Sequence, residues 1–236
     1  MTIQAYMSGN EFVNKILNGE RNFSNIRLES RFNLNKHEGF ITLNNYLKSQ
    51  TNLSDSPIIL DNSDLKGIIA KEVYLPYVSG KSVNFRWAKL YNANFRNVNF
   101  EGAEIRWASL IDANLEGANL ERANFRSTNL RDANLRYANL EKTNLSWANL
   151  EGANLECANI EGANLERSNI GWANLEGANL RNANFTWASL IYSNLKRTKI
   201  YNANFEETSL EGTRLENKKL SIKNNSIVNS KYSNRL

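Results

Sequence analysis

Few side chains in this sequence are of the types that catalyse reactions. His37 is the only histidine, so any Ser–His or Cys–His pair would depend on it, and an exposed loop histidine is the simpler interpretation. Cys157 is the only cysteine, which allows no internal disulfide and no cysteine-based metal site. We expect it to be a surface thiol. The sequence therefore predicts a protein that is not an enzyme and that has no cofactor and no metal site.

Four glutamates recur at a regular interval along the sequence and could act as neighbouring carboxylates. Carboxylates held side by side have raised pKa values or attract cations. The basic residues Arg122, Lys142 and Arg181 occupy nearby positions in the same pattern and would neutralise them. A solvated structural face is therefore the favoured interpretation of this column, which consists of Glu101, Glu121, Glu141 and Glu161.

Tryptophans and arginines recur at the same interval and could form a binding surface. Trp and Arg are the residue types that dominate hot spots in protein interfaces. A structural interpretation is equally open, in which the rings stack along the molecule with Arg167 between Trp147 and Trp187 as a cation–π rung. The candidate surface, called here the Trp/Arg face, consists of Arg86, Trp87, Arg106, Trp107, Arg126, Trp147, Arg167 and Trp187. A smaller cluster is expected on the adjacent face from Trp172, Ile191 and Tyr192.

These columns follow from a repeat of five residues. Every position ending in 5 or 0 from Phe85 to Leu215 is Leu, Phe or Ile, which makes 27 consecutive units. Two residues before each lies a small or β-branched residue, mostly Ala, and the residue between them is mostly Asn. A period of five fits neither an α-helix nor a flat strand. A coil that turns a corner in every unit fits it, because Asn tolerates turn conformations and bonds to nearby backbone.

The spacing of exposed residue types indicates four units in each coil. Trp87, Trp107, Trp147 and Trp187 follow one another at intervals of four, eight and eight units, which are all multiples of four. A second column alternates in charge at every fourth unit, so opposite charges would meet on adjacent coils about 4.8 Å apart. This column consists of Arg96, Glu116, Arg136 and Glu156. The sequence therefore predicts a right-angled β-solenoid.

The units resemble those of the pentapeptide repeat family, whose pattern is A(D/N)LXX. Residues 113–125, "ANLEGANLERANF", and residues 153–165, "ANLECANIEGANL", carry the resemblance, which covers residues 83–217. It implies an all-β fold, a right-handed quadrilateral β-helix with the large apolar residue and the small residue of each unit inside. It also implies that the protein can form a homodimer through the ends of the solenoid.

The ends of the chain depart from the repeat. Residues 1–22 are expected to contain a short capping helix over residues 9–19, because Phe12, Val13, Ile16 and Leu17 fall on one helical face. This opening resembles that of cyanobacterial members of the family. Residues 23–82 are interpreted as degenerate or irregular coils, with a separate small domain at 24–60 as the alternative. Residues 83–217 form the regular solenoid, and residues 218–236 form a basic C-terminal tail that is flexible or capping.

The charge distribution bears on the partner. The net charge of +5 divides into +1 for residues 1–82, −1 for residues 83–217 and +5 for residues 218–236. The basic character therefore belongs to the tail, which is weak support for a nucleic-acid partner. The chain shows no secretory signal and no apolar run long enough to span a bilayer, so we expect a cytoplasmic protein with no membrane partner.

Three functions compete on this basis. The favoured one is a rigid scaffold that binds an unidentified protein through the Trp/Arg face. The second is DNA mimicry directed at gyrase, which the resemblance suggests, but such a mimic must be strongly negative and only Asp112 and Asp132 are aspartates in the array. The third is direct binding of nucleic acid or glycan by Arg and Trp stacking.

Overall fold

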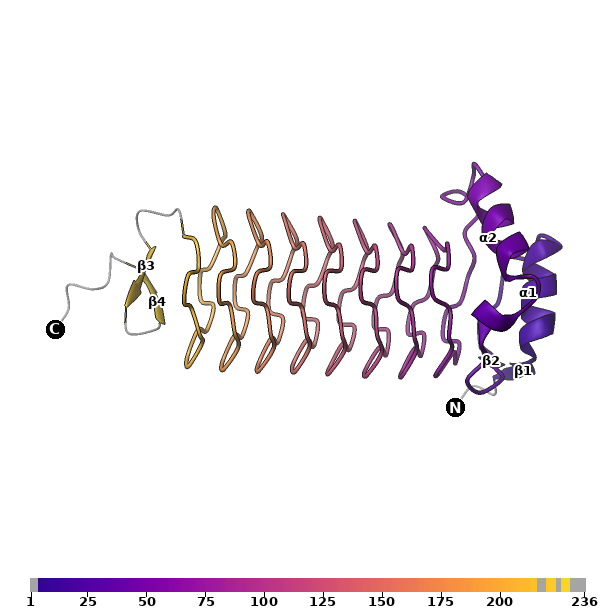
Figure 1. Ribbon diagram of the computed structural model, residues 1–236, viewed down its shortest axis with the longest axis horizontal. Helices are drawn as coiled ribbons and strands as arrows, with labels where there is room; N and C mark the ends of the chain where they lie inside the picture. Colours follow the sequence, from indigo (N-terminus) through magenta and orange to yellow (C-terminus); the bar gives the residue numbers. More distant parts are fainter. Residues whose placement is uncertain (1–3, 216–219, 224–225, 230–236) are drawn as a thin grey trace.

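Large apolar side chains that recur every five residues fill the interior of the molecule. In the computed structural model, which describes residues 4–215, 220–223 and 226–229, every position ending in 5 or 0 from Phe85 to Leu195 is buried. The small residue two positions earlier in each of these units is buried as well. The coils stack along the long axis of the molecule (Figure 1). Because both apolar positions of each unit are buried, the coils share one continuous core.

From Ile59 onward, a parallel ladder joins each coil to the next in a constant register, in which residue i pairs with residue i+20. One coil is joined to the next by four bridges, which are Asn84–Glu104, Lys89–Ser109, Asn94–Asn114 and Asn99–Asn119. Each coil therefore has four bridging positions separated by four two-residue turns. The fold is a β-helix, in which nearly every backbone donor of a coil has an acceptor in a neighbouring coil or in its own turn.

Each turn depends on a left-handed residue and on an asparagine. Every position ending in 2 or 7 from Asn62 to Gly212 has a positive φ, between 53° and 72°, and these residues are called corner residues below. The asparagine that precedes the turn accepts a hydrogen bond from the N–H two residues on, as Asn114 Oδ1 does from Glu116 at 3.0 Å. Its amide also donates to the asparagine one coil earlier, as Asn119 Nδ2 does to Asn99 Oδ1 at 3.1 Å. The repeated Asn thus stabilises both the turn and the stack.

Two helices lie at the N-terminal end of the coils (Figure 1). Helix α1 (Gly9–Leu17) lies in the range expected for a helix, and Ser8 caps it by accepting a hydrogen bond from the Glu11 N–H at 3.2 Å. The ring of Phe12, on its buried face, packs edge-on against Phe23 of the first coil at 5.0 Å. Helix α1 therefore buries its apolar side against the start of the solenoid core.

The ladder begins before the regular array. Strand β1 (Ala5–Met7) pairs in parallel with β2 (Ile26–Leu28), and β2 lies one coil before residues 59–69. The bridges Asn22–Ile59, Arg27–Asp64 and Asn33–Ile69 join partners that are further apart in the sequence than those of the regular coils. The extra residues form a short 3₁₀ helix η1 (Leu34–Lys36), helix α2 (Phe40–Ser49) and the loop that follows it.

Helix α2 lies inside the segment 23–82, and sequence analysis did not predict it. Only Leu43, Asn44 and Leu47 of its ten residues are buried, so it carries a short apolar pattern. Asn44 donates from Nδ2 to the Glu72 carbonyl at 3.0 Å and accepts from the Tyr74 N–H at 3.0 Å. The side-chain amide of Asn44 therefore pairs with two backbone groups that would otherwise need hydrogen-bond partners from a neighbouring strand.

At the other end, the last bridge joins Asn194 to Arg214. Strand β3 (Leu220–Lys223) pairs antiparallel with β4 (Ser226–Asn229). The predicted basic tail, residues 218–236, falls partly outside the described residues, and only this hairpin of it is described. Neither helix in the described part of the chain has the length and hydrophobicity that crossing a bilayer requires.

We predict that Asn44→Ala lowers the free energy of unfolding by about 2 kcal/mol, because it removes two partly buried hydrogen bonds, one to the Glu72 carbonyl and one from the Tyr74 N–H. Chemical denaturation measures this change. Asn45→Ala, which removes an exposed amide from the same helix, is the matched control and should change stability little. Equal effects of the two substitutions would show that the amide of Asn44 does not complete the ladder.

Candidate protein-interaction surface

The four tryptophans of the Trp/Arg face are corner residues in one column. Trp87, Trp107, Trp147 and Trp187 all have positive φ and occupy the same corner of their coils, so the ladder places them above one another. Their exposed fractions are between 44% and 52%. One flank of the solenoid therefore presents a line of half-exposed indole rings.

The first two rings are stacked. Trp87 and Trp107 lie with their centroids 5.1 Å apart and their planes 8° from parallel. The guanidinium of Arg86 lies 5.4 Å from the Trp87 centroid, and that of Arg106 lies 5.1 Å from the Trp107 centroid. Arg106 also pairs with Glu104 at 2.8 Å, which fixes its position beside the ring. Each of these two indoles therefore has its own cation.

The last two rings hold an arginine between them. The Arg167 guanidinium lies 5.0 Å from the Trp147 centroid and 4.1 Å from the Trp187 centroid. Glu166 pairs with it at 2.8 Å. The structure thus contains the cation–π rung that the sequence suggested, with Arg167 between the two indoles. Ser127, at the same corner between the two pairs of rings, has no ring to contribute, and Arg126 beside it is exposed.

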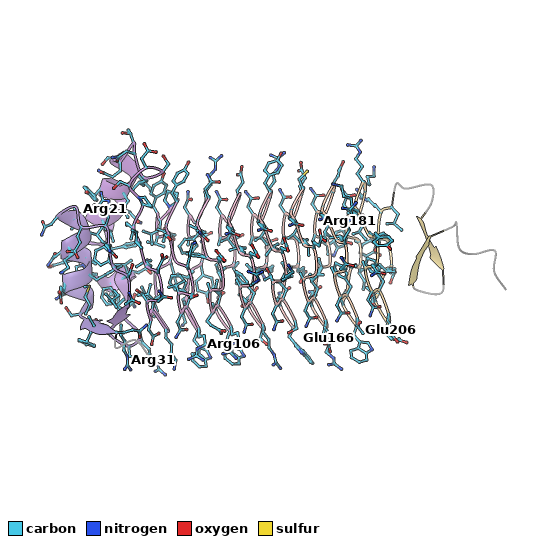
Figure 2. All side chains as sticks on the ribbon, turned by 180° about the vertical axis from the view of Figure 1, so that it is seen from behind. Arg21, Arg31, Arg106, Glu166, Arg181 and Glu206 are labelled. Carbon is cyan, nitrogen blue, oxygen red and sulfur yellow. The ribbon has the colours of Figure 1, made fainter. Side chains whose placement is uncertain are left out.

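The flank is also polarised along its length. The residue before each corner is basic in four successive coils and acidic in two later ones; in chain order these are Lys66, Arg86, Arg106, Arg126, Glu166 and Glu206. Figure 2 shows Arg31, Arg106, Glu166 and Glu206 in this order along one edge of the molecule. The N-terminal half of the flank therefore favours negatively charged groups.

The smaller cluster lies at the next corner along the chain. Trp172 and Tyr192 are in contact, with centroids 4.6 Å apart and planes 30° from parallel, and Trp172 is 64% exposed. The Tyr192 ring lies directly over Gly212, where a side chain would not fit. Ile191 is half-buried beside Tyr192. This cluster is a shorter aromatic pair, separate from the Trp/Arg face.

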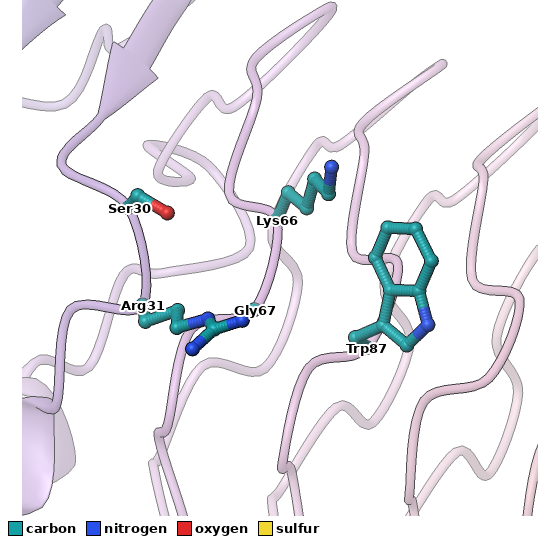
Figure 3. Close-up of a pocket in the computed structure, with 5 residues that line it drawn as sticks. All are labelled: Ser30, Arg31, Lys66, Gly67 and Trp87. Carbon is teal, nitrogen blue, oxygen red and sulfur yellow. The ribbon is translucent and has the colours of Figure 1, made fainter.

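Sequence analysis missed four residues at the N-terminal end of the Trp/Arg face, namely Ser30, Arg31, Lys66 and Gly67. Lys66 Nζ lies 4.6 Å from the Trp87 centroid. Together with Ser30, Arg31, Gly67 and Trp87, Lys66 lines a pocket of about 400 Å³ (Figure 3). Lys66 and Gly67 stand four units before Arg86 and Trp87, so that spacing could have revealed them. Arg31 could not be found in this way, because the insertion of α2 changes its offset.

The two candidates for nucleophilic chemistry, His37 and Cys157, are not among the residues that line this pocket. His37 Nδ1 accepts a hydrogen bond from the Gly39 N–H at 3.0 Å, and its ring meets Phe32 edge-on. Cys157 is an exposed free thiol at a corner of another face. Among the described residues, no group of three or more His, Cys, Asp or Glu side chains is placed to hold a metal ion.

Three of the four glutamates in the column form ion pairs with basic neighbours. Among the described residues no ion pair joins Glu161 to Arg181, and Glu161 instead accepts a hydrogen bond from Asn179 Nδ2 at 2.9 Å. Glu101 pairs with Lys81 at 3.6 Å, and Glu121 pairs with Arg122 at 3.2 Å. Lys142 lies 2.7 Å from Glu141, and its hydrogen bond lowers the pKa of that carboxyl below the ordinary value. At Glu141 the effect of Lys142 thus outweighs that of desolvation, which acts in the opposite direction.

The alternating charge column forms ion pairs between coils. Arg96 lies 3.6 Å from Glu116, and Arg136 lies 3.0 Å from Glu156. The hydrogen bond from Arg136 to Glu156 raises the pKa of the Arg136 guanidinium. Both pairs join residues i and i+20, as the ladder requires.

We predict that Arg167→Met lowers the free energy of unfolding by about 1 kcal/mol, because it removes the cation between two indoles but keeps a long side chain. Glu166→Gln is the control, since it removes only the exposed ion pair and should cost less than about 0.5 kcal/mol. Chemical denaturation compares the two. An effect of Arg167→Met no larger than that of Glu166→Gln would contradict the rung.

We predict that Lys142→Gln raises the pKa of Glu141 toward its ordinary value, which a pH titration of the glutamate side-chain carbons by NMR would measure. The sign follows from linkage: a carboxyl with a lowered pKa in the folded state stabilises that state above its unfolded pKa. This contribution is lost as the pH falls through the lowered value. Lys71→Gln, on another face, should leave the titration of Glu141 unchanged; an unchanged titration in Lys142→Gln would contradict the assignment.

The comparison with family models agrees with this architecture. The family model described as pentapeptide repeats matches residues 81–116, 108–146, 143–182 and 178–217. No curated protein matches the chain. Among solved structures, HetL from the cyanobacterium Nostoc sp. strain PCC 7120, described as involved in heterocyst differentiation regulation, is 26% identical. That match covers 89% of this chain and 97% of HetL, with a TM-score of 0.31.

Two further structures are similar. Rfr23 from the cyanobacterium Cyanothece 51142 is 26% identical over 75% of this chain and 95% of its own, with a TM-score of 0.26. QnrB1, a plasmid-mediated fluoroquinolone resistance protein, is 18% identical over 91% of each chain, with a TM-score of 0.41. The family model covers more than half of the chain, and its matches coincide with the regular coils of the ladder. The chain therefore belongs to the pentapeptide repeat family.

Proposed function

We propose that this protein is a non-enzymatic scaffold that binds a protein partner through the Trp/Arg face. In this proposal the solenoid is a right-handed, four-sided β-helix whose first coil is capped by the N-terminal helices. The observation that carries the proposal is the alignment of four half-exposed tryptophans at one corner of the coils. Half-exposed Trp flanked by Arg is the composition of interface hot spots.

The coils do not need tryptophan at their corners. The same left-handed position is occupied elsewhere by Gly, Asn, Asp, Lys and Ser, with the same backbone conformation. Four of the five tryptophans of the chain nevertheless lie in a single column. The concentration of rings on one flank supports a role beyond the geometry of the turn, since exposed aromatic rings are otherwise unfavourable for solubility.

Rigidity makes such a flank suitable for recognition. Trp87 is held by Trp107 and by two cations, and Trp147 and Trp187 are held by Arg167. Side chains that are already ordered lose less conformational entropy when a partner covers them. A partner would therefore meet a surface that is formed before binding.

The charge of the solenoid disfavours the alternative of a DNA mimic. Residues 83–217 carry a net charge of −1, whereas a surface that replaces DNA must present many negative groups. The basic half of the Trp/Arg face moves the local charge further from that of DNA.

We predict that Trp107→Ala combined with Trp147→Ala weakens the binding of the partner at least tenfold, as expected for the loss of about two hot-spot residues. Affinity capture from native lysate, followed by titration of the retained protein, measures this change. The far-ultraviolet spectrum should be unchanged and the melting temperature only slightly lower.

The matched control is Trp172→Ala combined with Tyr192→Ala, which removes an aromatic pair from the adjacent corner. Equal loss of binding in the control would contradict the assignment to the Trp/Arg face. A fall of many degrees in melting temperature on loss of Trp107 and Trp147 would show that these rings serve the solenoid itself. Capture of nucleic acid that is lost at high salt would favour direct nucleic-acid binding instead.

A further inference from the structure

At the N-terminal end of the Trp/Arg face, the corner one coil before Trp87 is occupied by a glycine, Gly67, and therefore carries no ring. In three successive coils this corner is occupied by Arg31, which lies before the regular array, and by the corner residues Gly67 and Trp87, with φ of 58°, 72° and 59°. Gly67 has no side chain and lines the pocket of about 400 Å³ together with Arg31 and Trp87. Figure 3 shows Arg31 and Trp87 on either side of Gly67, with Lys66 beside them.

The size of this gap fits one planar group. Residues two coils apart are separated by about 9.6 Å, twice the spacing of paired strands. The same arrangement is filled further along the column, where Arg167 lies between Trp147 and Trp187 at 5.0 and 4.1 Å from their centroids. One face of Trp87 is covered by Trp107. The ring also contacts two cations, the exposed Lys66 side chain at 4.6 Å and the Arg86 guanidinium at 5.4 Å from its centroid, and Lys66 and Trp87 both line the pocket beside Gly67. A flat ring above Gly67 would continue the stack.

The surroundings of the gap are cationic. In the described part of the chain, no carboxylate lies within ion-pair distance of Arg31, Lys66 or Arg86. The Nε of Arg86 is buried and has no hydrogen-bond partner among these residues. Uncompensated cations around an aromatic slot favour a ligand that joins a ring to negative groups.

We propose that this pocket receives an aromatic side chain of the partner protein, flanked in the partner's sequence by carboxylates. The ring stacks on Trp87 above Gly67, and the carboxylates pair with Arg31 and Lys66. The Lys66 ammonium leaves the indole face to do so and exchanges a cation–π contact for an ion pair. This inference rests on the proposed function, because it names the chemistry that the Trp/Arg face recognises at its basic end.

The probe is the tripeptide acetyl-Asp-Tyr-Glu-amide, titrated into the full-length protein while the indole N–H signals are followed by NMR. We expect the Trp87 signal to shift saturably and the Trp172 signal, on the adjacent face, to stay in place. The neutral peptide acetyl-Asn-Tyr-Gln-amide should bind about tenfold more weakly, because charge-assisted hydrogen bonds are lost. A Trp87 signal that does not move, or equal binding of the neutral peptide, would overturn the proposal.

Gly67→Trp blocks the gap with a side chain that this corner already accommodates in the neighbouring coils. A Cβ at Gly67 would meet Arg31 Cγ at 3.4 Å, an ordinary contact. The matched control is Gly162→Trp on another face, where the Cβ would meet Lys142 Cγ at 3.5 Å. Loss of the Trp87 shift in Gly67→Trp, with retention in Gly162→Trp, supports the pocket. Retention in both overturns it.

A second pair of variants tests the charges without filling the gap. Arg31→Gln combined with Lys66→Gln should abolish the preference for the acidic peptide, whereas Lys71→Gln, which removes a cation from above Tyr91, should retain it. Binding of uridine monophosphate as tight as that of the acidic peptide would overturn the choice of a peptide ligand. If the peptide fails to bind while the Trp107 and Trp147 substitutions still release the partner, that result rejects the pocket as a binding site for an aromatic side chain. It leaves intact the proposal that the partner binds through the Trp/Arg face.

Discussion

The constant register of the parallel ladder is the constraint on which the rest of this structure depends. Because residue i pairs with residue i+20 throughout the regular coils, every column on the surface is a set of residues at that interval. The inward Leu and Ala positions hold the register, since a slip of one residue would turn polar side chains into the core. The stacked rings, the ion pairs between coils and the polarised flank all follow from it.

Asparagine makes this register compatible with a nearly neutral solenoid. Its amide accepts a hydrogen bond in its own turn and donates another to the asparagine of the preceding coil, as Asn139 does to Asn119 at 3.2 Å. Aspartate could perform only the first of these tasks, because an ionised carboxylate has no donor. The side chains that remain at the turns then set the charge of each flank independently. On the Trp/Arg face they produce a basic end and an acidic end.

The sequence predicted those features that depend on the regular register. The column from Trp87 to Trp187 and the rung at Arg167 could be derived by counting in steps of four units. Helix α2 and the pocket could not, because the insertion between residues 34 and 57 interrupts the count and places Arg31 one coil before Gly67 at a longer offset. The hydrogen bonds from Asn44 to the backbone of residues 72 and 74 could not be predicted either. They leave no repeating pattern in the sequence, since a single asparagine in a short helix looks like any other polar residue.

The most direct test of the account is the rate at which each tryptophan is oxidised by hydroxyl radicals, measured by mass spectrometry with and without the bound partner. Trp172 is more exposed than the other four and lies at a different corner, so it serves as an internal reference. The account predicts that Trp87, Trp107, Trp147 and Trp187 become protected in the complex while Trp172 is oxidised at its free rate. Protection of Trp172 with unchanged oxidation of the four would contradict it.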